Sequence, residues 1–165
     1  MYFFYPCYGS TGQELATSIF SMAPMRTQGD SLSSPSSIRL QWKYDVFLSF
    51  KGEDTSNTFT GHLYTILKQK GIYTFRDDKN VGRGKSISST LLKAIEESMF
   101  AIIIFSRNYA SSTWCLDELA KIVGCMKEMK MTILPIFYDV DPFDIRKQIE
   151  TFAQTFATKN VLRRT

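Results

Sequence analysis

The chain is poor in the residues that build metal centres and disulfide frameworks. Its 165 residues include a single histidine, His62, and three cysteines, an odd number. Structural zinc sites take Cys and His ligands in closely spaced pairs, and these cysteines have no such spacing. We therefore expect no metal site. Cys115 and Cys125 fall in a helical pattern, which predicts buried free thiols in a reducing compartment.

Long apolar runs are also missing. The longest strong one is MFAIIIF at 99–105, whereas a helix needs about 20 apolar residues to cross a bilayer. No lysine or arginine precedes Arg26, although a secretory signal begins with a positively charged segment. These absences predict no membrane span and no signal peptide. We expect a soluble protein of the cytoplasm, with the nucleus as a second compartment.

The central part of the chain has no excess of basic charge. The net charge of the whole chain is +4, but residues 43–157 contain 15 Lys and Arg against 14 Asp and Glu. The excess lies near the C-terminus, at Lys159, Arg163 and Arg164. A domain that binds nucleic acid through its phosphates carries a basic face of its own. The charge distribution therefore argues against nucleic acid as a partner.

The composition divides the chain into three segments. Residues 1–42 lack sustained periodicity, and TQGDSLSSPSS at 27–37 is rich in Ser, Pro and Gly, as disordered segments are. From Lys43 onward, apolar runs alternate with helical patterns. We predict a disordered leader over 1–42, one folded domain over 43–157 and a basic tail over 158–165.

Four apolar runs with helical patterns between them predict the fold. Runs as apolar as residues 102–104 suit strands that are buried on both faces, as in a parallel sheet. Repeated strand and helix units are joined by right-handed crossovers, so we predict a doubly wound parallel sheet with helices on both faces. The predicted strands cover 44–50, 71–75, 99–106 and 131–140, and the predicted helices centre on 59–67, 87–95, 115–126 and 142–148.

Ligands of such sheets bind beyond the carboxyl ends of the strands. One segment at that edge, GRGKS at 82–86, invites comparison with a phosphate-binding loop, which needs G-x-x-x-x-G-K-[ST]. Lys79 stands where the first glycine belongs, so we exclude an NTP-binding loop and leave a flexible or an interacting loop. A phosphorylation-receiver domain is excluded too, because the third strand ends IIIFSRN without a carboxylate. Asp77 and Asp78 lack a third ligand, which favours a solvated turn over a cation site.

The stretch YASSTWCLDELAKI at 109–122 places small hydroxyl residues before a helical pattern. We expect Asp117 and Glu118 to lie in the first helical turn, where the helix dipole stabilises an acid by about 0.3–1 kcal/mol. Local evidence favours that role. Trp114 and Glu118 nonetheless share a helix face, and a carboxylate beside an aromatic ring can stabilise the oxocarbenium-like transition state of glycosidic cleavage. The residues alone leave both interpretations open.

Three stretches together resemble the plant Toll/interleukin-1 receptor (TIR) domain. They are YDVFLSFKGEDTSNTFTGHLYTILKQKGIYTFRDD, AIIIFSRNYASSTWCLDELAKI and ILPIFYDVDPFDIRKQ. The match covers residues 43–157. The resemblance implies a flavodoxin-like fold, which agrees with the sheet described above. It also implies a final helix with a Trp-Arg-x-x-Leu pattern, which we expect this chain to lack.

The resemblance implies an NAD+ glycohydrolase or ADP-ribosyl cyclase-type activity that makes signalling nucleotides in plant innate immunity. NAD+ is then the substrate, no cofactor is needed, and activity depends on self-association with other TIR domains. The catalytic glutamate of the family's W-C-L-x-E-L motif corresponds to Glu118. The implied substrate-binding residues are Phe50, Lys51, Gly52, Glu53, Asp54, Ser112 and Trp114. The implied self-association residues are Gly61, His62, Gly82, Arg83 and Gly84.

Four positions depart from the family's pattern. Lys51 replaces an arginine and loses its planar fork, and Ser56 replaces a second common arginine. Gly61 stands where the family often has serine before His62, and Phe143 replaces a serine in the D-P-x-D motif. These departures and the missing final helix leave a second function open. The chain would then be a non-catalytic adaptor or decoy that acts only through contact with other TIR domains.

Overall fold

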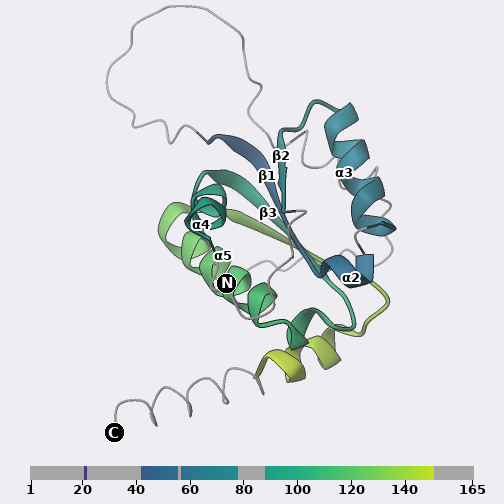
Figure 1. Ribbon diagram of the computed structural model, residues 1–165. Coiled ribbons are helices and arrows are strands. Elements are labelled where there is room, and N and C mark those ends of the chain that lie inside the picture. The colour runs from purple at the N-terminus through teal and green to yellow at the C-terminus, as the bar shows by residue number, and fades with distance from the viewer. Residues whose placement is uncertain (1–20, 22–41, 56, 78–87, 151–165) are drawn as a thin grey trace, which may run out of the picture.

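The computed structural model describes residues 21, 42–55, 57–77 and 88–150 (Figure 1). Several predictions fall outside these residues. They concern nearly all of the leader over 1–42, Ser56, the loop residues Gly82, Arg83 and Gly84, and the basic tail over 158–165.

The described residues form a four-stranded parallel sheet in the order β2-β1-β3-β4. This confirms the predicted doubly wound sheet, because β1 lies at its centre and the chain adds β2 on one side and β3 and β4 on the other. Val46 of β1 lies between Thr74 of β2 and Phe100 of β3. The strands are β1 (Tyr44–Phe50), β2 (Thr74–Arg76), β3 (Ser98–Phe105) and β4 (Thr132–Phe137).

The second strand begins three residues later than the predicted range of 71–75. The end of the preceding helix occupies that space, since Gly71 adopts φ +75° and Ile72 N–H donates to the Leu67 carbonyl at 3.0 Å. A left-handed glycine with such a bond is a common helix ending. The apolar Ile72 therefore serves the helix terminus and the core, and pairing with β1 starts only at Thr74.

Four helices lie where the 3.6-residue periodicity predicts them: α3 (Phe59–Gln69), α4 (Ser89–Glu96), α5 (Thr113–Met129) and a helix over residues 142–150. Two short elements were not predicted, α2 (Gly52–Thr55) and the 3₁₀ helix η1 (Tyr109–Ser111). Ser88 and Ser112 cap α4 and α5 by accepting from the backbone N–H groups of Leu91 and Cys115. Among the described helices, none has an apolar stretch long enough to cross a membrane.

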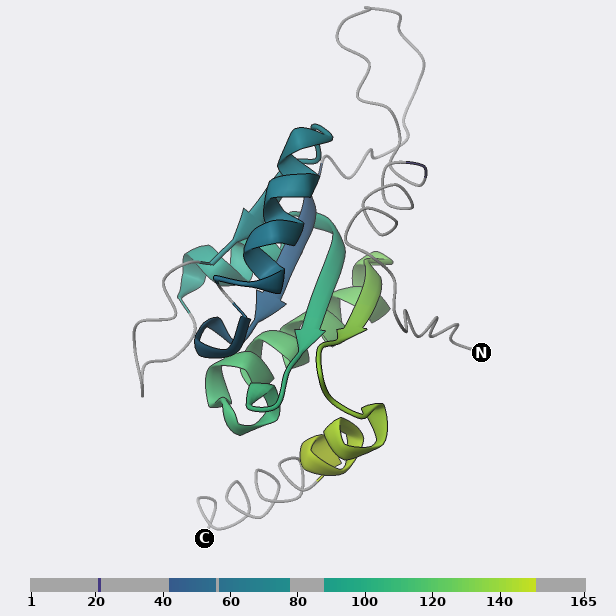
Figure 2. The ribbon, with the colours of Figure 1, turned by 90° about the vertical axis from the view of Figure 1, so that its right-hand side faces the viewer.

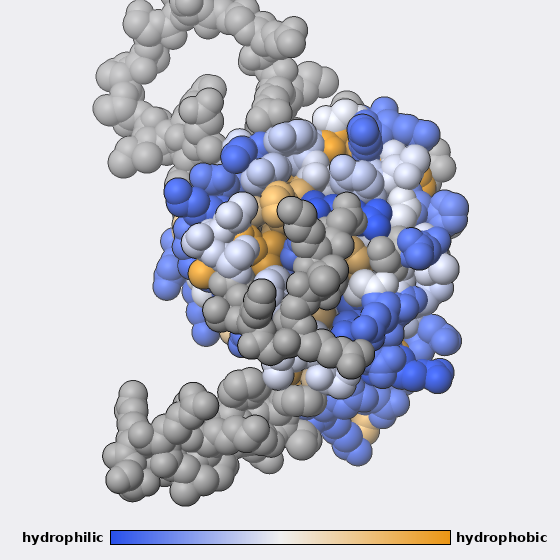
Figure 3. All heavy atoms as spheres, in the orientation of Figure 1, coloured by the Kyte–Doolittle hydropathy of each residue, from blue (hydrophilic) through white to orange (hydrophobic). Residues whose placement is uncertain are grey.

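Helices cover both faces of the sheet (Figures 1 and 2). Alternate residues of β1 point to opposite faces, so Val46, Leu48 and Phe50 pack under α3, whereas Phe47 faces α4 and α5. Ser49 follows the same alternation and points to the α5 side. Hydrophilic residues cover most of the described surface in Figure 3, with some apolar residues showing near its middle. The sheet is thus buried on both faces, as its apolar strands predict.

Candidate active site

Glu118 is the buried carboxylate of the site. It lies on the face of α5 that packs against β1, and only 3% of its surface is exposed. Its neighbour Asp117 is exposed on the other side of the helix. The expected place of both acids in the first helical turn is wrong: Ser112 caps the helix so that α5 begins at Thr113, and its first turn holds no acid. Because the dipole effect fades within the first turn, it does not account for Glu118.

Two side chains donate hydrogen bonds to the Glu118 carboxylate. The indole Nε1 of Trp114 lies 2.8 Å from Oε1, and the Ser49 hydroxyl lies 2.6 Å from Oε2. The predicted shared face of Trp114 and Glu118 is confirmed by the first bond. Ser49 comes from β1 and is fully buried. The carboxylate is therefore held from its own helix on one side and from the sheet on the other.

Glu118 titrates near neutral pH. Burial raises its pKa from the ordinary value of 4.5 to about 7, while the hydrogen bonds from Ser49 and Trp114 lower it and the negative charge of Asp77 raises it. Burial disfavours the charged form of any carboxyl group. Carboxyl groups with such raised pKa values beside a pocket are typical of catalytic sites.

Behind the Glu118 carboxylate, the Tyr109 phenol makes two further contacts. The phenol oxygen of Tyr109, a fully buried residue of η1, is 2.8 Å from Ser49 Oγ. The same phenol donates to the Cys115 carbonyl oxygen at 3.2 Å. Sequence reasoning did not single out Ser49 or Tyr109. The available signal was Ser49 itself, a lone hydroxyl residue in the apolar run VFLSF.

Cys115 is an inert thiol in this arrangement. It is fully buried, and its Sγ lies 3.7 Å from the Phe50 carbonyl oxygen. Burial raises the pKa of this thiol to about 12. Cys115 and Cys125 are both free and buried, which confirms the predicted state of the two thiols.

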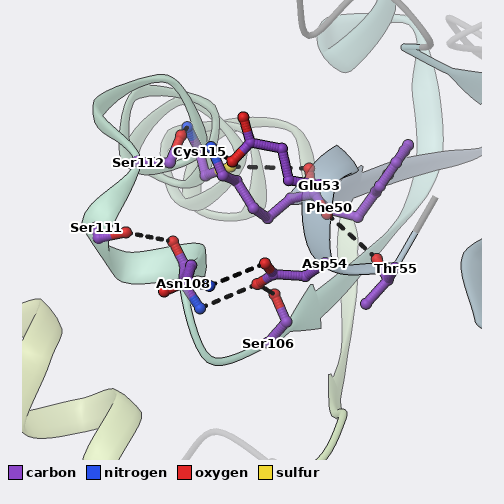
Figure 4. Close-up of polar contacts among 10 residues, drawn as sticks. Phe50, Glu53, Asp54, Thr55, Ser106, Asn108, Ser111, Ser112 and Cys115 are labelled. Carbon is purple, nitrogen blue, oxygen red and sulfur yellow. Dashed lines mark hydrogen bonds and ion pairs between the residues drawn. The ribbon is translucent and has the colours of Figure 1, made fainter.

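The segment after β1 is anchored by Asp54 of α2 (Figure 4). Its carboxylate accepts from the Ser106 hydroxyl at 2.6 Å and from the backbone and side-chain N–H groups of Asn108, both at 3.0 Å. Burial acts to raise the pKa of Asp54, but these hydrogen bonds, aided by Lys51, outweigh it and the pKa is lowered. Asp54 thus ties α2 to the loop that leads from β3 to α5.

The other implied substrate-binding residues lie in different surroundings. The Phe50 ring is buried on the α3 face, across the sheet from Glu118, with the Arg76 guanidinium 5.5 Å from its centre. Lys51 Nζ lies 3.5 Å from Glu53 Oε2, and Gly52 begins α2. The Ser112 hydroxyl accepts from Cys115 N–H at 3.3 Å. Of the seven residues, Trp114 contacts Glu118 directly, through the hydrogen bond from its indole N–H.

A pocket of about 550 Å³ opens beside Trp114. Glu118 is not one of the described residues that line it, whereas Trp114 both lines the pocket and donates to the Glu118 carboxylate. Asp77 is one of its lining residues, whereas the guanidinium of Arg76, another, lies against the Phe50 and Tyr64 rings on the α3 face. The described residues that line it are Phe75, Arg76, Asp77, Ser88, Thr90, Leu91 and Trp114.

The implied self-association residues that the structure describes lie in the first turn of α3. His62 is exposed and Gly61 is half-buried. The Gly61 carbonyl oxygen accepts from the Thr65 hydroxyl at 2.9 Å. These residues are on the opposite side of the sheet from Glu118, as the position of α3 in Figure 1 shows. A contact made through them would not touch the pocket directly.

Comparisons with known proteins agree on one family. The TIR domain model matches residues 43–164. The chain is 60% identical over 124 residues to the TMV resistance protein N of Nicotiana glutinosa and 54% identical over 130 residues to the disease resistance protein RPV1 of Vitis rotundifolia. These alignments cover 75% and 79% of the chain but only 11% and 9% of the two relatives, so the chain spans about a tenth of their length.

A solved structure gives the same result. The TIR domains in the structure of the activated Roq1 resistosome, which directly recognises the pathogen effector XopQ, are 58% identical to the chain, with a TM-score of 0.61. That alignment covers 70% of this chain and 70% of the other. The predicted flavodoxin-like arrangement is therefore found in a close relative of known structure.

Proposed function

The chain belongs to the TIR domain family, and from that premise we propose that it cleaves NAD+ between nicotinamide and ribose. The products are nicotinamide and ADP-ribose-type nucleotides that act as signals in plant innate immunity. The observation that carries the proposal is Glu118, a buried carboxyl group with a pKa of about 7, held by Trp114 at the margin of a pocket.

The reaction asks for one well-placed carboxylate. When the bond between ribose C1′ and the nicotinamide nitrogen breaks, its electron pair leaves with nicotinamide, which departs as a neutral molecule. The ribose is left as an oxocarbenium ion whose positive charge a carboxylate stabilises. Water then adds to C1′ and loses a proton to give ADP-ribose, or a nucleophilic group of the nucleotide itself adds and gives a cyclic product. No general acid is needed, because the leaving group requires no proton.

The described residues can supply the parts of this reaction. Glu118 in its ionised form is the proposed catalytic carboxylate. Trp114, which lines the pocket, offers an aromatic face to the nicotinamide or ribose. A volume of about 550 Å³ lies within the range of about 300–1,000 Å³ that is usual for small-molecule sites.

The proposed activity requires the site to open. Glu118 is 3% exposed, and hydrogen bonds occupy both of its oxygens. We expect a ribose that contacts Oε1 to displace the Trp114 indole N–H. We expect contact with further TIR domains to favour the open position of Trp114, so that turnover depends on self-association.

The test is nicotinamide release from NAD+ by the purified chain, tethered on a scaffold at high local concentration. Wild type should release nicotinamide, and both Glu118→Ala and Glu118→Gln should release none. Asp117→Asn is the matched control, because it removes the exposed carboxylate next to Glu118 and should leave release unchanged. Equal rates in wild type and both Glu118 variants would sink the proposal.

A second candidate function is that of a non-catalytic adaptor that binds other TIR domains. The exclusion of Glu118 from solvent favours it, since the carboxylate is inaccessible in the single chain. An adaptor would release no nicotinamide under any tethering condition but would still bind a TIR domain. His62→Ala, on the exposed side of α3, should then weaken binding, which light scattering of the mixture measures.

A further inference from the structure

A chain of hydroxyl groups runs from Glu118 into the core. Ser49 Oγ lies 2.6 Å from Glu118 Oε2 and 2.8 Å from Tyr109 Oη. Tyr109 Oη in turn lies 3.2 Å from the carbonyl oxygen of Cys115. Ser49 and Tyr109 are both fully buried, so no solvent molecule competes for these contacts.

The protons available to this chain depend on the state of Glu118. Three contacts join the four groups, and the two hydroxyls carry one proton each. A protonated Glu118 brings the third, so that the acid donates to Ser49, Ser49 donates to Tyr109, and Tyr109 donates to the Cys115 carbonyl. An ionised Glu118 reverses the direction: Tyr109 donates to Ser49, and Ser49 donates to the carboxylate. The heavy atoms need not move between the two patterns.

We propose that Ser49 and Tyr109 are positioning residues that form a reversible hydrogen-bond relay behind Glu118 and give its carboxyl group a partner in both protonation states. The proposal rests on the proposed function only where it takes Glu118 as the catalytic carboxylate. The relay itself is a property of the fold. Trp114 completes the arrangement, because its indole N–H donates to Oε1 whether Oε2 is protonated or not.

The relay matters because a buried carboxyl group without partners would stay neutral far above neutral pH. The two patterns differ in strength, since a hydrogen bond to a carboxylate is stronger than one between neutral groups. The Ser49 end of the relay therefore favours the ionised form, and its hydrogen bond lowers the pKa of Glu118, which burial raises to about 7. Near that pH the carboxylate that the chemistry needs is present in a large fraction of molecules.

Among the residues that the structure describes, few charged groups act on the charge of Glu118. Asp77, after β2, is the negative charge that raises its pKa. Tyr109 of η1 stays neutral, because burial raises its pKa well above the ordinary value. Cys115 of α5 also stays neutral, with a pKa of about 12. Lys51, after β1, is paired with Glu53 at 3.5 Å.

The test follows the indole N–H resonance of Trp114 by NMR as the pH is raised in the full chain. The sequence has two tryptophans, so Trp42→Phe identifies the Trp114 signal. Its shift reports the charge of Glu118 because the two groups are hydrogen-bonded. We expect a midpoint near 7 in wild type and an upward displacement of roughly half to one pH unit in Ser49→Ala. Tyr109→Phe keeps the ring and should displace the midpoint upward by less.

Ser98→Ala is the matched control. Ser98 is a fully buried serine of β3 whose hydroxyl donates to the Ala94 carbonyl at 2.6 Å, away from Glu118. This variant should keep the wild-type midpoint. A Ser49→Ala midpoint equal to or below that of wild type overturns the relay. If Ser49→Ala does not fold, an unchanged midpoint in Tyr109→Phe overturns it instead.

The same samples separate the relay from the proposed function. If NAD+ is cleaved, the acid limb of nicotinamide release should move with the indole midpoint in each variant. A displaced midpoint in a protein that releases no nicotinamide at any pH would end the enzymatic proposal and leave the relay standing. Release whose pH dependence ignores a displaced midpoint would support the relay but remove Glu118 as the catalytic carboxylate.

Discussion

Replacing Glu118 with glutamine should stabilise the protein at alkaline pH. The pKa of Glu118 is about 7 in the fold against an ordinary 4.5, and each pH unit of difference corresponds to about 1.36 kcal/mol. Ionising this group therefore costs the folded state about 3 kcal/mol. Glutamine has the same shape, carries no charge, and can accept from Trp114 while it donates to Ser49. It reproduces the neutral form of the site at every pH.

The sign of the pH dependence follows from proton binding. Between 4.5 and about 7 the folded protein holds the Glu118 proton more tightly than the unfolded chain does. Wild-type stability should therefore fall as the pH rises through this window and level off above it. Glu118→Gln should lack this decline. The variant should exceed wild type by about 3 kcal/mol at pH 8 and by less than about 1 kcal/mol at pH 5.

Urea unfolding of both proteins at pH 5 and pH 8 measures the difference. Thermal unfolding should show it too, with a melting temperature on the order of 10 °C higher for Glu118→Gln at pH 8. Asp117→Asn is the control, because this neighbouring carboxylate is exposed. Its effect should be small and similar at the two pH values. A Glu118→Gln advantage that is the same at pH 5 and pH 8 would refute the assigned burial and pKa of Glu118.

Three further outcomes follow from the site. Nicotinamide release should rise with pH through about 7, because only the ionised form of Glu118 stabilises the oxocarbenium ion; a flat profile from pH 6 to pH 8 would contradict this. Ser112→Ala should lower the free energy of unfolding by about 1 kcal/mol, because it removes the cap of α5. Thr113→Ala, one residue later, should not lower it, and urea titration of both variants checks this. Asp54→Asn should destabilise the protein at pH 7 by about 1–3 kcal/mol. Because the pKa of Asp54 is lowered in the fold, this deficit relative to wild type should shrink on acidification. The same urea series measures it, and a deficit that does not change with pH would contradict the assigned contacts of Asp54.

Short-range patterns in the sequence predicted most of the architecture. The apolar runs place β1, β3 and β4, the capping serines begin α4 and α5, and the four-residue spacing puts Trp114 and Glu118 on one helix face. Such features depend on neighbours within a turn or a strand, so they can be read along the chain. The same reading misplaced the start of β2, where Ile72 is as apolar as a strand residue but packs at the end of α3.

The sequence could not settle the role of Glu118. From the sequence, Glu118 could have been an acid that only complements the helix dipole. The adjacent Asp117 fitted that role equally well. In the fold the two acids separate, since Asp117 is exposed and Glu118 is buried against β1. The partner that makes the difference, Ser49, is 69 residues away along the chain.

The sequence by itself therefore determined the family, the order of strands and helices, and the stretch in which the carboxylate lies. Only the tertiary structure decided that Glu118 titrates near neutral pH, that Ser49 and Tyr109 lie behind it, and that its partner Trp114 lines a pocket. The physical reason is that a pKa depends on burial and on partners brought together by the sheet and α5. Neither the burial of Glu118 nor its contact with Ser49 exists until β1 and α5 pack against each other.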